Sequence, residues 1–195
     1  MVVLEREDVV DPISTDDLSL RGLVLAAQPE LLDPNFQQSL IFLADHTDEG
    51  AFGLVLNRPT GKCLGDLMTE PQPADPVCNI PVCLGGPVQR EKVLLAAFEK
   101  GDSREDVRCR FDVGLEDVED FLSCPDHWVR AFLGFSGWTE GQLEGELAEN
   151  TWQLCEPSVA LFDERFASNL WSMFTAPDQR WRQLLSYLPK DPSRN

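Results

Sequence analysis

The sequence has few basic residues and very little histidine. Its 195 residues include 16 Lys or Arg and two His against 34 Asp or Glu, so the formal net charge is −18. A charge of that sign repels phosphate backbones and anionic membrane surfaces unless a local basic patch overcomes it. Arg104, Arg108 and Arg110 come nearest to such a patch, but acidic residues stand among them. We therefore expect no direct contact with nucleic acid and no membrane association.

Long apolar runs are also missing. Charged residues at positions 5 to 8 leave no room for the apolar region of a secretory signal. No stretch reaches the roughly 20 apolar residues that a membrane-spanning helix needs. The six cysteines include no Cys-x-x-Cys pair, so we expect free thiols in a reducing compartment rather than a disulfide framework. Together these absences predict a cytoplasmic protein.

The chain has the length and composition of one ordinary domain, with 43% hydrophobic residues. Residues 1–20 are acidic and weakly patterned, and we expect an extended arm. Residues 21–188 carry the apolar patterning of a single compact domain, and residues 189–195 form a short polar tail.

Short apolar runs of β character dominate the domain. They cover residues 22–27, 39–45, 51–56, 81–84, 92–98, 109–113, 128–135, 152–155 and 158–162. The runs at 39–45 and 51–56 predict a hairpin, and those at 81–84 and 92–98 are expected to pair. Helical spacing predicts helices over 62–69 and 115–122, one carrying Phe166, Leu170 and Phe174 after an Asp163 cap, and one spanning 181–188. The pattern indicates an α+β fold, with a largely antiparallel or mixed sheet or sandwich and helices packed against it.

The densest local signal lies between Phe132 and Trp152. Thr139 and Gln142 have the spacing of a helix capping box, and Trp138 and Leu143 that of a hydrophobic staple. Gly134, Gly137, Gly141 and Gly145 fall in the same stretch. Glycine inside a helix costs about 1 kcal/mol against alanine, so we expect close approach by another backbone or a ligand there.

Three short motifs offer candidate chemistry. His46 stands beside Asp45 and Asp48 and could bind a divalent cation or act in acid–base catalysis, but turns favour these residue types in any case. Gly85-Gly86-Pro87 could hold an anion through backbone N–H groups or form a tight turn. Asn57-Arg58-Pro59 places a guanidinium at a strand end, where it could bind a carboxylate or phosphate or pair with an internal acid. The thiol and imidazole of Cys124-Pro-Asp-His127 are interpreted as parts of a loop that ends a helix.

Several blocks, taken together and in order, carry a family resemblance. They are Gln28-Pro29, Asp33-Pro34-Asn35-Phe36, His46 to Leu54, Asn57-Arg58-Pro59, Gly85 to Val88, and Leu133 to Trp138 with Gly141-Gln142-Leu143-Glu144-x-Glu146. The chain resembles the YqgE/AlgH family over about residues 20–188. The resemblance implies a compact cytosolic α+β domain of unknown function. Its association with transcriptional regulation rests on one named member rather than on a DNA-binding motif.

Two positions depart from the family pattern. Many members carry Leu-His where this chain has Ala96-Ala97, and only the acid of a Ser-x-Asp motif is kept, as Asp117. A mechanism built on that histidine therefore has no counterpart here.

The sequence predicts a non-enzymatic binding or regulatory module that recognises an unknown protein or small-molecule ligand. The alternative is a hydrolase or metal-dependent enzyme that uses His46 with neighbouring carboxylates. We predict no catalytic residue, no metal and no cofactor, and the sequence leaves the oligomeric state open. The residues predicted to bind the ligand or partner are His46, Asn57, Arg58, Gly85, Gly86, Gly137, Trp138 and Gln142.

Overall fold

The computed structural model describes residues 19–70, 76–101, 107–111, 113–162 and 169–175. Its strands are β1 (Val24–Ala27), β2 (Leu40–Thr47), β3 (Gly50–Val55), β4 (Pro59–Cys63), β5 (Pro81–Leu84), β6 (Val88–Lys100), β7 (Val107–Phe111), β8 (His127–Thr139) and β9 (Trp152–Cys155). The α-helices are α1 (Leu115–Leu122), α2 (Gln142–Ala148) and α3 (Leu170–Thr175). Short 3-10 helices span Leu64–Leu67, Pro76–Asn79 and Val159–Phe162. The predicted α+β class with a mixed sheet is confirmed.

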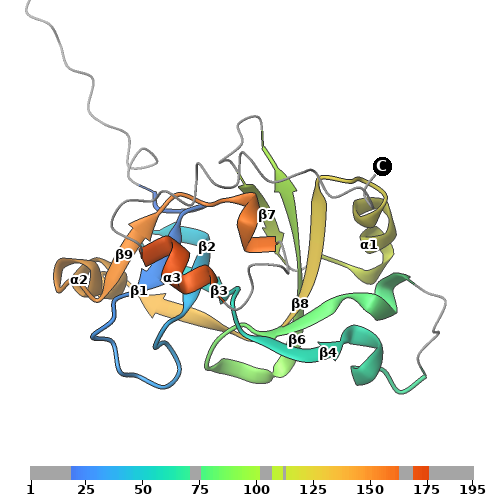
Figure 1. Ribbon diagram of the computed structural model, residues 1–195, viewed down its shortest axis with the longest axis horizontal. Helices are drawn as coiled ribbons and strands as arrows, with labels where there is room; N and C mark the ends of the chain where they lie inside the picture. The colour runs from blue at the N-terminus through green and yellow to red at the C-terminus, as the bar shows by residue number, and fades with distance from the viewer. Residues whose placement is uncertain (1–18, 71–75, 102–106, 112, 163–168, 176–195) are drawn as a thin grey trace, which may run out of the picture.

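Strand β8 joins the two halves of a curled sheet (Figure 1). The strands follow the order β4-β5-β8-β3-β2-β1-β9, and β6 pairs with both β7 and β8. The first half of β8 pairs with β5 and β6, and its second half pairs with β3. Gly134 lies at the change of partner with φ +70°, and a Cβ there would lie 2.5 Å from the Val88 carbonyl oxygen. The close backbone approach expected in this stretch is therefore confirmed at Gly134.

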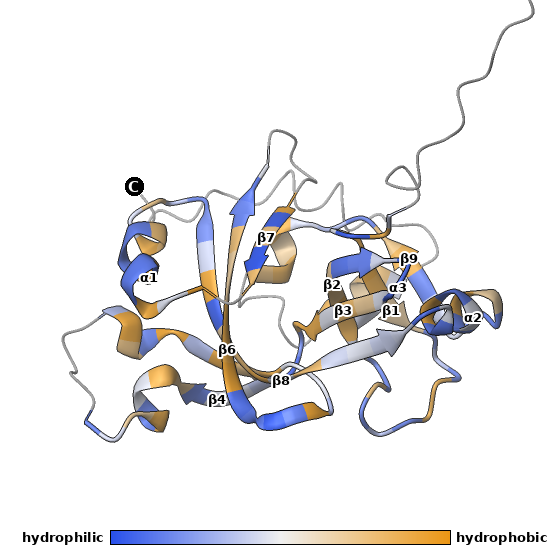
Figure 2. Ribbon diagram, turned by 180° about the vertical axis from the view of Figure 1, so that it is seen from behind, coloured by the Kyte–Doolittle hydropathy of each residue, from blue (hydrophilic) through white to orange (hydrophobic). Residues whose placement is uncertain are grey.

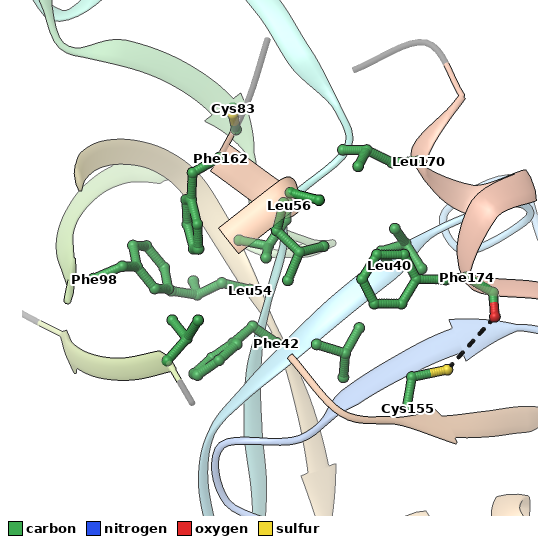
Figure 3. Close-up of a cluster of buried hydrophobic side chains, with 14 of the residues drawn as sticks. Leu40, Phe42, Leu54, Leu56, Cys83, Phe98, Cys155, Phe162, Leu170 and Phe174 are labelled. Atoms are coloured by element: carbon green, nitrogen blue, oxygen red, sulfur yellow. Dashed lines mark hydrogen bonds between the residues drawn. The ribbon is translucent and has the colours of Figure 1, made fainter. Parts of the chain in front are cut away.

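Three groups of buried side chains form the core. The largest includes Phe42, Phe98 and Phe162, and Figure 3 shows these rings between the sheet and the C-terminal segments. A second group lies under α1 and is centred on Val118. The third packs Trp138, Leu143 and Trp152 together with residues of β1 and β2. Trp138 and Leu143 thus share one cluster, although α2 starts at Gln142, so they do not occupy the positions of the predicted staple.

Two segments differ from the elements that their local periodicity predicts. Residues 59–63 form the edge strand β4, and only Leu64–Leu67 is helical, as a 3-10 turn, so the predicted helix at 62–69 is wrong. Only Leu64 is buried in that turn, because the segment closes the edge of the sheet rather than packing a helical face. The predicted strand at 158–162 is also wrong, since Val159–Phe162 forms a buried 3-10 helix.

Strand partners differ from expectation as well. Strand β5 pairs with β4 and, in parallel, with β8, so the expected pairing of 81–84 with 92–98 is wrong. The hairpin of β2 and β3 and the bounds of α1 are confirmed. Leu170 and Phe174 are buried in α3, whereas Phe166, the Asp163 cap, the helix at 181–188, residues 1–18 and the tail lie outside the described residues.

No helix in the described ranges combines the length and the apolar character needed to cross a membrane.

Candidate functional site

His46 is held by hydrogen bonds on both ring nitrogens. Its Nδ1 accepts from the Leu20 backbone N–H at 3.1 Å, and its Nε2 lies 2.8 Å from Glu144 Oε1. An accepting Nδ1 places the proton of the neutral ring on Nε2, which then donates to Glu144. The Ser19 hydroxyl also donates to the His46 carbonyl oxygen. His46 therefore fastens the segment Ser19–Gly22 to the end of β2.

Glu144, in the first turn of α2, is the side-chain partner of His46. Its own backbone N–H and the hydrogen bond from His46 lower the pKa of its carboxyl group. The side chain is 53% exposed, so solvent screens most of the interaction. Across the described residues, no group of three His, Cys, Asp or Glu side chains is placed to hold a metal ion. The structure does not assemble a metal site around His46, Asp45 and Asp48.

Glu146, on the same helix, holds two tryptophans. Its Oε2 accepts from the indole N–H of Trp138 at 2.9 Å and of Trp152 at 2.7 Å. The rings of Trp138 and Trp152 meet edge to face with centroids 6.2 Å apart. Gln142 Nε2 donates to Glu146 Oε1 at 2.9 Å. We call His46, Trp138, Gln142, Glu144, Glu146 and Trp152 the α2 joint.

The cap of α2 differs from the prediction. The N-cap is Gly141, with φ +68°, rather than Thr139. Gln142 Oε1 accepts from the Thr139 N–H at 3.2 Å, which is one half of the predicted capping box. The Thr139 hydroxyl also donates to that oxygen, so it makes no bond to the helix backbone. The left-handed turn at Gly141 moves the helix start two residues beyond the expected position.

A Cβ at Gly141 would meet no atom within 4 Å, and two further glycines of this stretch have no crowded neighbour. A Cβ at Gly145 would meet no atom within 4 Å, and one at Gly137 would meet only the Phe135 ring at 3.4 Å or more. The expected close backbone approach is therefore wrong at all three positions. Nothing in the structure explains why glycine stands at Gly137 or Gly145.

Asn57 and Arg58 lie in a second group of predicted residues. Asn57 accepts from the Leu40 N–H and donates to the Gln38 carbonyl, both at 2.8 Å. Arg58 donates to the carbonyl oxygens of Pro34 and Gln37 at 3.2 and 3.1 Å. Burial and the nearby Arg90 lower the Arg58 pKa, while Asp33 opposes the shift. In the described part of the chain, Arg58 makes no ion pair, so it is bonded to a loop backbone.

Gly85 and Gly86 pack against the bend of β8. A Cβ on Gly85 would clash with the Gly134 carbonyl oxygen, and one on Gly86 with the Phe135 backbone. The Gly85 carbonyl accepts from the Val55 N–H and the Ser136 hydroxyl. These contacts account for both glycines by packing alone.

The eight predicted residues therefore form two groups. His46, Gly137, Trp138 and Gln142 lie around α2, while Asn57, Arg58, Gly85 and Gly86 lie where β3, β4 and β5 meet. The loop after β1 contacts the α2 joint and the second group: the Phe36 ring lies against Trp152 of the joint with centroids 5.6 Å apart, and Pro34 and Gln37 accept from Arg58. A role in binding stays a prediction for these residues.

A cleft of about 720 Å³ runs along the edge of β7. All five β7 residues line it, and Ser19, Arg21, Gly22, Phe42, Ala44, Ala97, Glu99 and Phe121 complete its walls. Among the strands of the described residues, β7 pairs only with β6, and the cleft lies along its other edge. Hydrophilic and hydrophobic residues alternate along β7 (Figure 2). We call this hollow the β7 cleft.

Three arginines line the β7 cleft. Arg110 stands opposite Ala97, and Arg108 opposite Glu99, in the pairing of β7 with β6. The Arg110 guanidinium lies 5.1 Å from the centre of the Phe121 ring. Arg21 enters from the segment that His46 holds. Among the residues that the structure describes, three guanidiniums and one carboxylate line this cleft, whereas the whole chain has a net charge of −18.

Cys109 is the cysteine that lines the β7 cleft. Burial raises the pKa of its thiol to about 12, against an opposing effect of Arg21. The thiol is neutral at physiological pH and is a poor nucleophile. The cleft therefore offers charge and apolar surface for binding rather than an activated cysteine.

The sequence predicts no binding at Arg108 and Arg110, because acidic residues stand among them, whereas the structure places both in the β7 cleft. The signal that was overlooked is their spacing of two, which places both on one face of a strand. Arg21 carries no local signal, because only the fold brings it to β7.

The fold and its clefts define a class: a single-domain α+β protein built on a curled mixed sheet with open, ligand-sized hollows. Residues 24–193 match the model of the AlgH-like family. A UPF0301 protein of Stutzerimonas stutzeri is 38% identical over 165 residues, covering 77% of this chain and 84% of its own length. UPF0301 protein SCO2948 of Streptomyces coelicolor is 34% identical over 190 residues, covering 93% and 98%.

A solved structure agrees with these sequence matches. The solution structure of the AlgH protein from Pseudomonas aeruginosa matches with a TM-score of 0.59 and 25% identity, covering 96% of this chain and 100% of that one. The chain belongs to the AlgH-like family, whose function is uncharacterised, and the resemblance drawn from the sequence blocks is confirmed.

Proposed function

We propose that this member of the AlgH-like family is a cytoplasmic, non-enzymatic binding protein that takes part in transcriptional regulation without touching DNA. The observation that carries the proposal is the β7 cleft, which brings Arg21, Arg108 and Arg110 to one hollow in a chain of net charge −18. Its volume of about 720 Å³ falls in the usual range of ligand sites. The ligand is a negatively charged molecule, drawn to a positive site on an otherwise negative surface.

The arrangement of His46 supports a binding role over a catalytic one. A general base needs a free lone pair within reach of the substrate. The Nδ1 lone pair of His46 is occupied by the Leu20 N–H, and its Nε2 is engaged by Glu144. Turnover of generic phosphatase or esterase substrates that disappears in His46→Gln would contradict this part of the proposal.

The charge balance supports regulation without DNA contact. Duplex DNA carries dense negative charge, and non-specific binding depends on its neutralisation by Lys and Arg. A tight, salt-dependent shift of random duplex DNA at moderate salt would contradict the proposal.

The binding role of the cleft is tested by citrate in thermal unfolding at constant ionic strength. We expect citrate to raise the Tm of the wild type and of the control Lys62→Gln, whose lysine lies on β4 outside the cleft. The double variant Arg21→Gln/Arg110→Gln should lose that rise, because the two guanidiniums are gone while the fold is kept. An equal rise in the double variant would refute the cleft as the binding site.

The α2 joint, together with Asn57, Arg58, Gly85 and Gly86, remains a proposed second contact surface for a protein partner. Pull-downs with Arg58→Ala and Gln142→Ala test it. Full recovery of every partner by both variants would contradict this surface.

A further inference from the structure

A second cleft is lined by residues of β3, β6, β7 and β8. Its volume of about 550 Å³ falls in the usual range of small-molecule sites. The described residues that line it are Phe52, Leu54, Gln89, Lys92, Val93, Leu94, Leu95, Ala96, Phe111 and Phe135. We call it the Phe52 cleft. It shares Phe111 with the β7 cleft, but none of the three arginines of the β7 cleft lines it.

Three phenylalanine rings pack together in the Phe52 cleft. The Phe52 ring lies 5.3 Å from that of Phe111 and 5.0 Å from that of Phe135, measured between centroids, with interplanar angles of 40° and 41°. Phe111 stands opposite Ala96 in the pairing of β7 with β6, so both side chains lie on one face of the sheet. Phe111 is 41% exposed. An aromatic ring left open to water in a cleft is typical of a surface that a ligand covers.

Gln89 and Lys92 are the polar side chains of the cleft. Leu94 packs against the same core group as Phe52 and Phe135, and alternation along β6 places Lys92 on the same face as Leu94. Among the described residues, Lys92 is the only charged residue that lines the cleft. Both polar side chains are exposed, and within the same ranges neither makes a hydrogen bond or an ion pair with the rest of the chain.

A bulge in β6 positions these two side chains. Residues 89–92 stand opposite Gly134 alone, because the register with β8 shifts between Val88 and Val93. Gln89 has φ +51°, a left-handed conformation that residues other than glycine rarely adopt. Bulges are enriched next to functional sites, where they redirect a side chain.

Arg90 holds the bulge in place. Its Nε donates to the Gly86 carbonyl oxygen at 3.3 Å, and its Nη2 donates to Asn35 Oδ1 at 2.7 Å. A Cβ on Gly134 would lie 3.2 Å from the Cα of Arg90, so glycine lets the bulge lie close to β8. The backbone of the bulge is therefore fixed by contacts within the chain, while its two cleft-lining side chains can bind a ligand.

We propose that the Phe52 cleft binds a dissolved aromatic carboxylate, with its rings against Phe52, Phe111 and Phe135 and its carboxylate beside Lys92 and Gln89. Contacts between aromatic rings stabilise a complex beyond the burial of apolar area. One ammonium group and one amide can pair with a single carboxylate, whereas a polyanion would bring unpaired charge against apolar side chains. This site is additional to that of the proposed function, and no arginine contributes to it.

Calorimetric titration of the full chain with 2-naphthoate and two matched analogues tests the class of ligand. The alcohol 2-naphthalenemethanol has the same rings without the charge and should bind about fivefold more weakly. Decahydro-2-naphthoate keeps the charge without the aromatic rings and should bind about threefold more weakly. Equal affinity for 2-naphthoate and either analogue would overturn the proposal, as would a failure of 2-naphthoate to bind at millimolar concentration.

Lys92→Gln tests the contact with the carboxylate. It should weaken 2-naphthoate binding by about fivefold and leave binding of the alcohol unchanged, because the alcohol has no charge to pair with the ammonium group. Lys62→Gln is the same substitution outside both clefts and should bind both molecules as the wild type does. An equal loss of 2-naphthoate affinity in the two variants would contradict the placement of the carboxylate.

Phe52→Leu tests the aromatic contact. It should weaken 2-naphthoate binding by about threefold, because leucine keeps an apolar side chain but removes the ring. Phe135→Leu gives the same test if Phe52→Leu does not fold. The control Phe121→Leu changes a ring that lines only the β7 cleft and should not alter 2-naphthoate affinity. Unchanged affinity in both Phe52→Leu and Phe135→Leu would refute the ring contacts.

Gln89→Gly separates a role in binding from a role in the fold. Glycine adopts φ +51° without strain, so the variant should not have a lower Tm than the wild type. It should nevertheless bind 2-naphthoate about threefold more weakly, because the amide is gone. An unchanged affinity would show that Gln89 is not a binding residue.

The double variant Arg21→Gln/Arg110→Gln distinguishes the two clefts. We expect it to lose the rise in Tm with citrate and to keep the affinity for 2-naphthoate. Loss of 2-naphthoate binding in this variant, with full binding in Lys92→Gln, would place the molecule in the β7 cleft and overturn the proposal. Absence of any citrate effect in the wild type would refute the proposed function and leave the aromatic carboxylate site standing.

Discussion

The α2 joint and the β7 cleft use their polar side chains in opposite ways. At the joint, His46, Gln142 and Glu146 bond to other groups of the same chain. In the cleft, Arg21 and Arg110 line an open hollow, and Arg110 has an aromatic ring as its neighbour. The joint has the denser sequence motif, yet its contacts are explained by structure. The comparison teaches that a dense motif can mark a structural joint, while an open cleft brings together residues that are far apart in the sequence.

The two regions are nevertheless connected through His46. The segment Ser19–Gly22 bonds to His46 at its start and carries Arg21 into the cleft. The joint therefore positions one wall of the cleft.

The largest expected effect on stability distinguishes Gly134 from Gly145, two glycines of the same stretch. Gly134→Ala should destabilise the protein by about 3 kcal/mol, because the new Cβ meets the Val88 carbonyl and the residue keeps a positive φ. Gly145→Ala, in open space on a helix, should stabilise it by about 1 kcal/mol. Urea unfolding measures both. Equal effects of the two substitutions would show that the bend of β8 does not depend on glycine.

The next largest effect concerns the hydrogen bonds from Trp138 and Trp152 to Glu146. Glu146→Ala should cost roughly 2–3 kcal/mol, since two indole N–H groups lose a charged acceptor. Glu140→Ala, an exposed acid just before α2, is the matched control and should change stability by less than about 0.5 kcal/mol. The free energy of unfolding in urea decides between them. A loss of stability no larger than that of the control would mean that these two hydrogen bonds contribute nothing to the free energy of unfolding.

His46 links the two regions, so its replacement should affect both. His46→Ala should cost about 1 kcal/mol for the hydrogen bond with Leu20 and should reduce the rise in Tm with citrate, because Arg21 is less firmly placed. Thermal unfolding with and without citrate measures both effects. An unchanged citrate response would break the proposed connection between joint and cleft.

Replacing a cleft arginine should cost little stability. Arg110→Gln removes an exposed cation–π contact with Phe121 and should destabilise the protein by roughly 0.5–1 kcal/mol. Urea unfolding checks this alongside the binding measurements. A loss as large as that from Glu146→Ala would show that Arg110 supports the fold rather than a ligand.

The smallest effect concerns pH. Because the folded-state pKa of Glu144 is lowered, its contribution to stability is present above the unfolded pKa of roughly 4.3 and is lost as the pH falls through the folded value. The stability difference between wild type and Glu144→Gln should therefore be small near pH 7 and disappear in acid. Urea unfolding at pH 7 and pH 3 tests it, and a difference that grows in acid would contradict the assigned sign.

The sequence predicted elements better than it predicted their neighbours. The α1 helix follows from Leu115, Val118 and Leu122, whose spacing fixes one apolar face, and its bounds are as predicted. The partners of β5 could not be predicted, because an apolar run has the same pattern whichever strand it joins. The apolar run at Val159–Phe162 forms a buried 3-10 helix, so its apolar residues are explained by burial and not by pairing with another strand.

The candidate site was predicted only in part, for a related reason. His46, Arg58 and Gln142 are predicted to bind a ligand or partner, and in the structure each has intramolecular hydrogen-bond partners. Arg21 lines the β7 cleft, but no motif in the sequence indicates this.

The sequence by itself determined which segments have a face to bury and the excess of negative charge. Each depends on the residue itself or on near neighbours. Only the tertiary structure decided that His46 bonds to Leu20 and Glu144, that Glu146 accepts from two indoles, and that Arg21 lines the same cleft as Arg110. These contacts join positions far apart in the chain, and their geometry is set by the packing of the whole sheet rather than by any local pattern.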